Sequence, residues 1–250
     1  MNLVRNIRLY VDNELSLNKE LALATSSSHY LCNVMRCREG DSIKCFNSQD
    51  GEFLCRICKA DKKQTIICAY EQTRTPQTES DLWLLFAPLK KDKTDFVIEK
   101  AVELGVSRIV PIITAYTNSD KVKLERFTMQ AVEAAEQCER LSVPTICQPQ
   151  KLNEILKNWD TSRELFFMDE RRQGQGVVRV FQTTNCNKAA ILIGPEGGFS
   201  DEEASMLNNL EYVKNINLGP RILRAETAVA ASLAIYQACC GDWNKQEEKQ

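Results

Sequence analysis

The sequence predicts an α/β protein: a helix-covered parallel sheet preceded by a smaller β-rich segment. From residue 81 onward, apolar runs of strand length alternate with segments of helical periodicity, a pattern typical of a parallel sheet. Before residue 72, short strand-like runs are separated by turn sequences such as Asn47-Ser48-Gln49-Asp50-Gly51, which favours a small β-barrel or twisted sheet. Two glycine-containing loops, at 191–200 and 218–228, each follow an apolar run and lead into a helix.

Composition and turn signals divide the chain into four parts. We expect an N-terminal domain at 1–72, a polar linker at 73–80, a larger domain at 81–243 and a charged tail at 244–250. In the first domain, strands are expected at 7–11, 42–46, 52–58 and 65–70, with a helix at 28–35. In the second, strands are expected at 82–87, 108–113, 145–147, 165–168, 189–193 and 213–217. Helices are expected there at 94–104, 124–140, 152–159, 201–208 and 226–240, and less clearly at 173–187.

Capping signals support two of these helices. Thr94 precedes apolar residues at helical spacing, and Gly105 follows them, as expected for a helix start and stop. Ser200 and Glu203 have the spacing of a capping box at the start of the helix that follows the first glycine loop.

Charge and hydropathy exclude several classes of protein. The formal net charge is −2, which argues against a chain that binds nucleic acid through overall positive charge. No run of eighteen apolar residues and no apolar segment near Met1 are found, so we expect a cytoplasmic protein without a membrane span or a signal peptide. The sequence also lacks the Gly-x-Gly-x-x-Gly and Gly-Lys-Ser/Thr fingerprints, which disfavours a dinucleotide oxidoreductase and a P-loop enzyme.

The eleven cysteines are odd in number and scattered, as expected in a reducing compartment. Cys32, Cys37, Cys55 and Cys58 come near the spacing of a four-cysteine zinc site. However, no glycine or proline lies between the last two, and an offset of three in a strand places them on opposite faces. We therefore expect no metal.

The two glycine loops are the strongest candidates for a ligand site. Gly194-Pro195-Glu196-Gly197-Gly198 could be only a tight strand-to-helix connection, but glycine also lets a ligand approach the backbone closely. In the second loop, Arg221 and Arg224 lie near a helix start, where positive charge opposes the helix dipole. Such an arrangement fits either surface charge or an anionic ligand.

Other polar residues leave two interpretations open. The run Lys90-Lys91-Asp92-Lys93 follows the first strand of the second domain, and it fits either a solvated loop or a phosphate-binding segment. His29 is the only histidine. It fits either a helix-start surface residue or a substrate contact beside Arg36.

Taken together, these motifs resemble those of the bacterial 16S ribosomal RNA uracil-N3 methyltransferases, which belong to the SPOUT or α/β-knot class. Besides the two loops, the resemblance rests on Lys93-x-Asp95, on Glu99-Lys100-Ala101-x-Glu103-Leu104-Gly105-Val106 and on Glu133-Ala134-Ala135-Glu136-Gln137 to Arg140-x-x-x-Pro144. It extends to the N-terminal PUA-like domain through Val34-Met35-Arg36 and Gly40-Asp41. The resemblance covers nearly the whole chain.

The resemblance implies a SPOUT domain with a deep trefoil knot near residues 190–240, although general topology rules argue against knots. It also implies S-adenosylmethionine as cofactor, a homodimer, and a small-subunit ribosomal RNA substrate, expected in an assembled 30S particle. The implied cofactor contacts are Met168, Asp169, Glu170, Ile193, Gly194, Pro195, Glu196, Gly197, Gly198, Leu218, Gly219, Ile222, Leu223, Ala225 and Thr227.

Arg224 is the expected catalytic residue, with Glu196 or Glu226 orienting it or accepting a proton. The expected RNA contacts are Arg5, Arg8, His29, Arg36, Arg38, Lys90, Lys93, Arg140 and Arg221.

Two departures from the family pattern bear on RNA contacts. Residues 114–119 lack the arginine that the family usually has there, and Ser28 stands where a second histidine often precedes the one matching His29. Two other functions therefore remain as alternatives. The chain could be another SPOUT enzyme that acts on transfer RNA or a ribose hydroxyl, or a non-catalytic RNA-binding protein of ribosome assembly.

Overall fold

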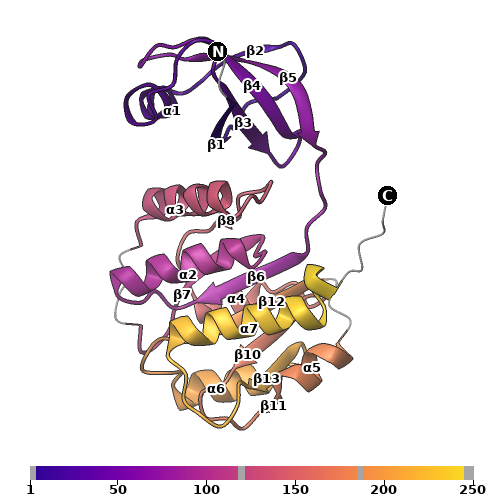
Figure 1. The fold of residues 1–250 in the computed structure, drawn as a ribbon. Coiled ribbons are helices and arrows are strands. Elements are labelled where there is room, and N and C mark those ends of the chain that lie inside the picture. Colours follow the sequence, from indigo (N-terminus) through magenta and orange to yellow (C-terminus); the bar gives the residue numbers. More distant parts are fainter. Residues whose placement is uncertain (1–3, 118–121, 185–187, 245–250) are drawn as a thin grey trace. The chain divides into compact units, whose positions relative to one another are not determined.

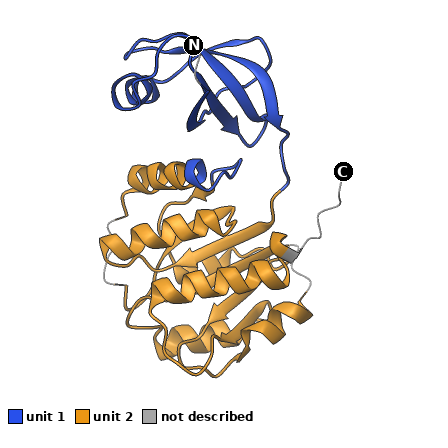
Figure 2. Ribbon diagram, viewed as in Figure 1, with its two compact units in different colours: residues 1–78, 135–143 blue, residues 79–134, 144–250 orange. Residues whose placement is uncertain are grey.

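The computed structural model describes residues 4–117, 122–184 and 188–244. The chain forms two compact units (Figure 2), residues 1–78 with 135–143 and residues 79–134 with 144–250. Residues 135–143, which the sequence boundaries assign to the second domain, thus group with the first unit. The polar segment 73–80 begins inside a strand, because that strand continues to Arg74.

The first unit contains a five-stranded sheet (Figure 1) with the order β1-β3-β4-β5-β2. Its strands are β1 (Val4–Tyr10), β2 (Glu20–Ala22), β3 (Ser42–Asn47), β4 (Gly51–Lys59) and β5 (Ile66–Arg74). β1 pairs with β3 in parallel, and the other pairs are antiparallel. Along β4, Cys55 is fully buried whereas Cys58 is exposed, so these two cysteines lie on opposite faces as predicted.

The helix predicted at 28–35 is wrong in its start and in its type. α1 (Thr25–His29) begins three residues earlier, and the chain continues as a π-helical turn, η1 (Tyr30–Val34). Leu31 on this turn is fully buried in the core of the first unit. Ser28 is also buried, and its hydroxyl accepts a hydrogen bond from the Thr65 amide at 2.8 Å.

The first unit is held together by a buried ion pair between Arg8 and Glu52. The side chains are 7% and 2% exposed, and Arg8 Nε donates to Glu52 Oε2 at 2.6 Å. The other Arg8 nitrogens donate to the carbonyl oxygens of Ala135 and Arg140, and the guanidinium lies 3.6 Å from the Phe46 ring centroid. Each of the three guanidinium nitrogens thus bonds inside the unit, and the structure gives no support to the predicted contact of Arg8 with RNA.

Replacing Glu52 by glutamine should destabilise the protein in a pH-dependent way. Burial alone would raise the pKa of Glu52, but hydrogen bonds from Arg8 and Thr73 outweigh it and lower this pKa below its ordinary 4.5. The carboxylate therefore stabilises the fold above that value, and its contribution is lost as the pH falls through the lower folded-state pKa. Glu52→Gln should cost about 3 kcal/mol at pH 7, because it leaves Arg8 buried without its counter-charge.

The free energy of unfolding is measured by urea unfolding of the full chain at pH 7 and below pH 4.5. Hydrogen exchange of the amides in β3 and β4 shows whether the stability is lost there. Glu71→Gln is the matched control, because Glu71 is an exposed acid on the neighbouring strand β5. The control should stay within about 0.5 kcal/mol of wild type. An equal cost of Glu52→Gln at both pH values would contradict the prediction.

The second unit contains the predicted parallel sheet, which is thereby confirmed. Its order is β11-β13-β10-β12-β6-β7-β8, with β9 also paired to β7, and the pairs are all parallel. The strands are β6 (Asp81–Phe86), β7 (Arg108–Ile113), β8 (Thr145–Ile146), β9 (Gln150–Lys151), β10 (Glu164–Met168), β11 (Gln175–Gly176), β12 (Lys188–Ile193) and β13 (Val213–Asn217). The sequence did not predict β9 and β11, which have two residues each.

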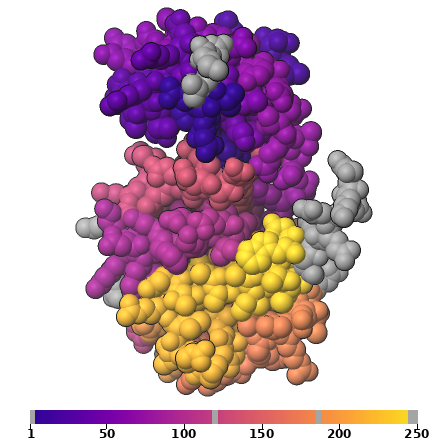
Figure 3. Space-filling view, viewed as in Figure 1, coloured from indigo at the N-terminus to yellow at the C-terminus, as the bar shows by residue number. Residues whose placement is uncertain are grey.

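Helices cover both faces of this sheet. The helices of this part of the chain are α2 (Lys91–Glu103), α3 (Leu124–Gln137), α4 (Leu152–Lys157), α5 (Val177–Thr183), α6 (Asp201–Asn208) and α7 (Ala225–Cys239), followed by the 3-10 turn η2 (Asp242–Asn244). The last three residues of α3 group with the first unit. α4 and α6 pack on one face, where Ile155 and Leu207 join the buried cluster around Leu85 and Leu192. α7 lies on the other face beside α2 and α5 (Figures 1 and 3), where Tyr236 packs against Phe166.

The capping predictions have different outcomes. The capping box of Ser200 and Glu203 is confirmed at the start of α6. Thr94 does not cap α2, because that helix begins at Lys91 and the buried Thr94 hydroxyl bonds to the backbone of Leu89.

The order of the strands places four carboxyl ends side by side. β12 is inserted between β10 and β6, although both precede it in the chain, and β13 lies on the outer side of β10. The strands are parallel, so the segments that follow β13, β10, β12 and β6 leave the sheet at one edge. Ligand sites of open α/β sheets form at this edge.

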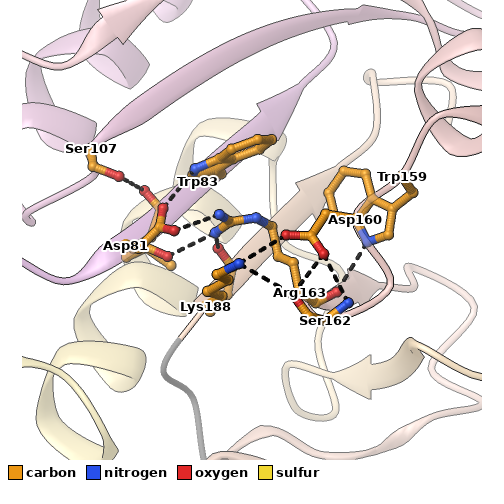
Figure 4. Close-up of polar contacts among 10 residues, drawn as sticks. Asp81, Trp83, Ser107, Trp159, Asp160, Ser162, Arg163 and Lys188 are labelled. Carbon is orange, nitrogen blue, oxygen red and sulfur yellow. Dashed lines mark hydrogen bonds and ion pairs between the residues drawn. The ribbon is translucent and has the colours of Figure 1, made fainter.

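At the opposite edge, Arg163 joins the amino ends of three strands (Figure 4). This side chain is 4% exposed and precedes β10. Its guanidinium donates to the carbonyl oxygens of Asp81 and Ala189 at 2.9 and 3.1 Å, and to Asp81 Oδ2 at 2.6 Å. The same group lies 3.8 Å from the Trp83 ring centroid. Arg163 thereby links β10, β12 and β6.

The described residues contain neither a helix suited to crossing a membrane nor a cluster of metal ligands. None of their helices has both the length and the apolar character to cross a membrane. No group of three or more histidine, cysteine, aspartate or glutamate residues among them is arranged to hold a metal ion.

Candidate functional site

A pocket of about 320 Å³ lies at the carboxyl edge of the parallel sheet. Its walls are the segments that follow β10, β12 and β13, together with Lys93 from the first turn of α2. The lining residues are Lys93, Met168, Asp169, Glu170, Arg172, Ile193, Gly194, Pro195, Glu196, Gly198, Leu218, Gly219, Arg221, Ile222, Leu223, Arg224, Ala225 and Ala228. The volume is in the range of pockets for small molecules.

The segment after β12 depends on two glycines. A Cβ on Gly194 would lie 2.6 Å from the Phe199 ring, and one on Gly198 would lie 2.2 Å from Glu170 Oε1. Gly198 also has φ of +73°, which other residues rarely adopt. Glu170 Oε1 accepts the Phe199 amide at 3.2 Å, so the first glycine loop is bound to the segment after β10.

Asp169 holds the segment after β10 in place. It is buried, and its carboxylate accepts hydrogen bonds from the Arg171 backbone and side chain and from the Asn215 amide. Burial alone would raise the pKa of Asp169, but these bonds outweigh it and the pKa is lowered. Asp169 therefore stays charged and has its acceptors occupied.

Arg172 joins two walls of the pocket. Its guanidinium donates to the Pro220 carbonyl oxygen at 2.7 Å, and its own carbonyl accepts from Asn217 at 3.2 Å. The sequence prediction missed Arg172, although it lies only two positions after the predicted residue Glu170. It missed Ala228 as well, which lies one helical turn beyond Ala225.

Lys93 lies between the two acids that were predicted to act in catalysis. Its Nζ is 3.2 Å from Glu196 Oε1 and 3.7 Å from Glu226 Oε1. Glu226 Oε2 is buried without a hydrogen-bond partner. Arg224 is the N-cap residue of α7, and its exposed side chain has no hydrogen bond or ion pair with any described residue. Of these two cations, Lys93 is thus paired, whereas Arg224 has no partner among the described residues.

The structure brings most of the predicted cofactor residues together. All of them line the pocket except Gly197, which packs against Tyr116, and Thr227, which is exposed on α7. Arg221 and Lys93, which were predicted to contact RNA, line the pocket as well. Glu226 is not a lining residue and reaches the pocket through Lys93.

The remaining cations predicted to contact RNA are in different environments. In the first unit, His29, Arg36 and Arg38 are exposed. Arg5 there is paired with Asp41 at 3.1 Å, and Arg140 Nε donates to the Ser142 hydroxyl at 3.1 Å. Lys90 belongs to the second unit and precedes α2.

Comparison with known proteins identifies the family of the chain. The family model of the RNA methyltransferase domain matches residues 75–237, and that of the RNA methyltransferase PUA domain matches residues 23–67. Ribosomal RNA small subunit methyltransferase E of Rickettsia conorii is 34% identical over 228 residues, covering 91% of this chain and 93% of that protein. This chain belongs to the ribosomal RNA small subunit methyltransferase E family. The resemblance inferred from the motifs is confirmed.

Three further comparisons agree with this family assignment. The Bacillus subtilis member is 32% identical over 224 residues, which covers 84% of this chain and 87% of the relative. The structure of the Neisseria gonorrhoeae member, bound to S-adenosyl methionine, is 26% identical with a TM-score of 0.83, covering 95% of this chain and 99% of that one. A Legionella pneumophila structure described as a methyltransferase with bound SAM is 29% identical with a TM-score of 0.83, covering 96% and 100%.

Gly198→Ala should loosen the first glycine loop. The new Cβ would approach Glu170 Oε1 to 2.2 Å at a backbone φ of +73°, so Glu170 would have to move away from the Phe199 amide that it accepts. The left-handed conformation alone costs about 1–2 kcal/mol for a residue with a Cβ. Hydrogen exchange at the Phe199 amide should therefore be faster than in wild type.

Gly176→Ala is the matched control, because a Cβ there would meet nothing within 4 Å. Its effect on Phe199 exchange should be negligible. Unchanged exchange at Phe199 in Gly198→Ala would show that the loop does not depend on this glycine.

Proposed function

We propose that this chain transfers a methyl group from S-adenosylmethionine to N3 of a uracil in small-subunit 16S ribosomal RNA. The observation that carries the proposal is the pocket at the carboxyl edge of the sheet. It combines a glycine-rich wall with the unpaired Arg224 in a member of a ribosomal RNA methyltransferase family. Two related structures hold S-adenosylmethionine, which supports the choice of donor.

The pocket has the size and the lining for S-adenosylmethionine. Its apolar walls come from Met168, Ile193, Leu218, Ile222 and Leu223. The bare glycines between them let a planar base approach backbone groups closely. S-adenosylmethionine would supply a methyl group that its sulfonium already activates. We assign the predicted cofactor residues that line the pocket to its binding.

The task of the protein is then to position the uracil and to stabilise the charge that develops on it. We assign that charge stabilisation to Arg224, whose guanidinium is exposed and unpaired beside the pocket. Glu196 and Glu226 hold Lys93 between them. Loss of the N3 proton requires an acceptor, and Glu196 is the better placed of the two acids because it lines the pocket itself.

Several finer features belong to the same proposal. We propose that the chain forms a trefoil knot, which agrees with the insertion of β12 between β6 and β10 and with α7 packing over β12. We also propose that the first unit is a PUA-like barrel that binds RNA through Arg5, His29, Arg36 and Arg38. The enzyme would act in the cytoplasm as a homodimer on an assembled 30S particle.

The proposed reaction is tested on the RNA itself. Small-subunit RNA from a strain that lacks the gene is digested, and its nucleosides are analysed by mass spectrometry. Loss of one N3-methyluridine, restored by the cloned gene, is the expected result. Loss of a different methylated nucleoside would assign another target, and an unchanged profile would exclude the activity.

Arg224→Ala should remove methyl transfer and leave cofactor binding nearly unchanged. Removal of one preorganised donor to a developing negative charge costs about 10²- to 10³-fold in rate. The measurements are single-turnover methylation and calorimetry with S-adenosylmethionine. Arg179→Ala, at an exposed position on α5, is the matched control and should behave as wild type. Full activity of Arg224→Ala would remove this residue from the mechanism.

A further inference from the structure

A second cavity of about 800 Å³ shares a wall with the first pocket. It is lined by Pro88, Leu89, Lys90, Lys91, Lys93, Glu196 and Arg224. Three of these, Lys93, Glu196 and Arg224, also line the first pocket. The two cavities are therefore adjacent, and the residues between them are those proposed to surround the reacting atoms.

The charges of the second cavity are mostly unpaired. Lys93 is neutralised by Glu196 and Glu226. Lys90, Lys91 and Arg224 are exposed and make no side-chain hydrogen bond or ion pair with any residue that the structure describes. The cavity floor is apolar, because Pro88 and Leu89 are buried. A polyanion with a planar, weakly polar part fits such a lining.

The position of these lysines is unfavourable for the fold itself. Lys90 is the N-cap residue of α2 and Lys91 its first residue, so both oppose the helix dipole. Neither makes an ion pair with a described residue that would offset this cost. Charged side chains that destabilise their own helix and line a cavity are expected to bind a ligand.

An exposed aromatic side chain lies on the far side of the same glycine loop. Tyr116 is 50% exposed, and its Cβ is 3.2 Å from where a Cβ on Gly197 would be. Gly197 follows Glu196, which contacts Lys93. The turn is held by the bond from the Ala115 amide to Glu203 at 2.9 Å. An exposed aromatic ring beside a loop that borders a cationic cavity is a surface on which an unstacked base can stack.

We infer that the second cavity binds the target nucleotide of the RNA in an unstacked conformation. Lys90 and Lys91 contact its phosphates, the floor formed by Pro88 and Leu89 contacts the base, and Tyr116 stacks on a neighbouring base. A base inside a folded RNA has to leave its stack before an enzyme can reach its ring. The inference rests on the proposed methyl transfer and adds the site of the substrate.

The first test is the double variant Lys90→Ala/Lys91→Ala, compared with wild type on small-subunit RNA. Its KM for RNA should rise about tenfold, and the slope of log affinity against log salt should fall by about 1.4, as expected for two lost single-strand phosphate contacts. Affinity for S-adenosylmethionine should be unchanged. The melting temperature should not fall, because the helix loses two unfavourable charges.

Lys157→Ala/Arg179→Ala is the matched control. It removes two exposed cations of the same unit that line neither cavity, and it should leave the KM and the salt slope nearly unchanged. An unchanged KM and slope in Lys90→Ala/Lys91→Ala would overturn the inference. A loss of cofactor affinity would do so too, because it would assign the lysines to the first pocket.

Tyr116 supplies a second, charge-independent test. Tyr116→Ala should raise the KM for RNA about tenfold with no change in the salt slope, and Tyr116→Phe should behave as wild type. Equal KM values for all three would exclude base stacking here. The methylation assay of the wild-type protein separates the two proposals. If the wild-type protein does not methylate the RNA, the proposed function fails. If the wild-type protein is active and the variants are unaffected, only the proposed nucleotide site is refuted.

Discussion

The hydrogen bonds of Arg163 set the geometry on which the rest of the second unit depends. From the residue before β10, the guanidinium bonds to the start of β12 and to the start of β6, so one rigid planar group fixes three neighbouring strands at their amino ends. Charge-assisted bonds are the strong class of hydrogen bond, and the Trp83 ring shields this group from water. With the amino ends held level, strands of five or six residues bring their carboxyl ends to one edge.

The pocket forms at that edge of the sheet. The segments after β10 and β12 can approach closely because Gly198 has no side chain where Glu170 lies, and Arg172 ties the segment after β13 to them. The anchoring charges, Asp169 and Arg172, are satisfied by the protein. This leaves a rigid wall on one side and the unpaired Arg224 on the other. Rigid walls hold a reacting group in place. A cation without partners in the protein can form an ion pair or hydrogen bond with negative charge on the substrate.

The sequence predicts those parts of the fold whose signals are local. The central strands β6, β7, β10 and β12 are largely apolar runs, and Ser200 and Glu203, three positions apart, form the capping box. Thr94 has the same local signal and a different role, because its hydroxyl is used by Leu89. The π-turn at Tyr30–Val34 and the two-residue strands depend on tertiary packing. The glycine loops identify the pocket, but Arg172 enters it through a contact with Pro220, forty-eight positions away.

The roles of the arginines show most clearly what cannot be decided from the sequence alone. Arg8 and Arg224 both fit a role in RNA binding when only neighbouring residues are considered. In the fold, Arg8 lies opposite Glu52, which is distant in sequence, and each of its three guanidinium nitrogens makes a hydrogen bond inside the unit. Arg224 has no such partner among the described residues and lines two cavities. Burying a cation requires a counter-charge, whereas a cation left unpaired beside a cavity retains its attraction for an incoming anion. For these two arginines, burial and pairing within the protein, rather than residue type, separate the structural charge from the one proposed to act on the substrate.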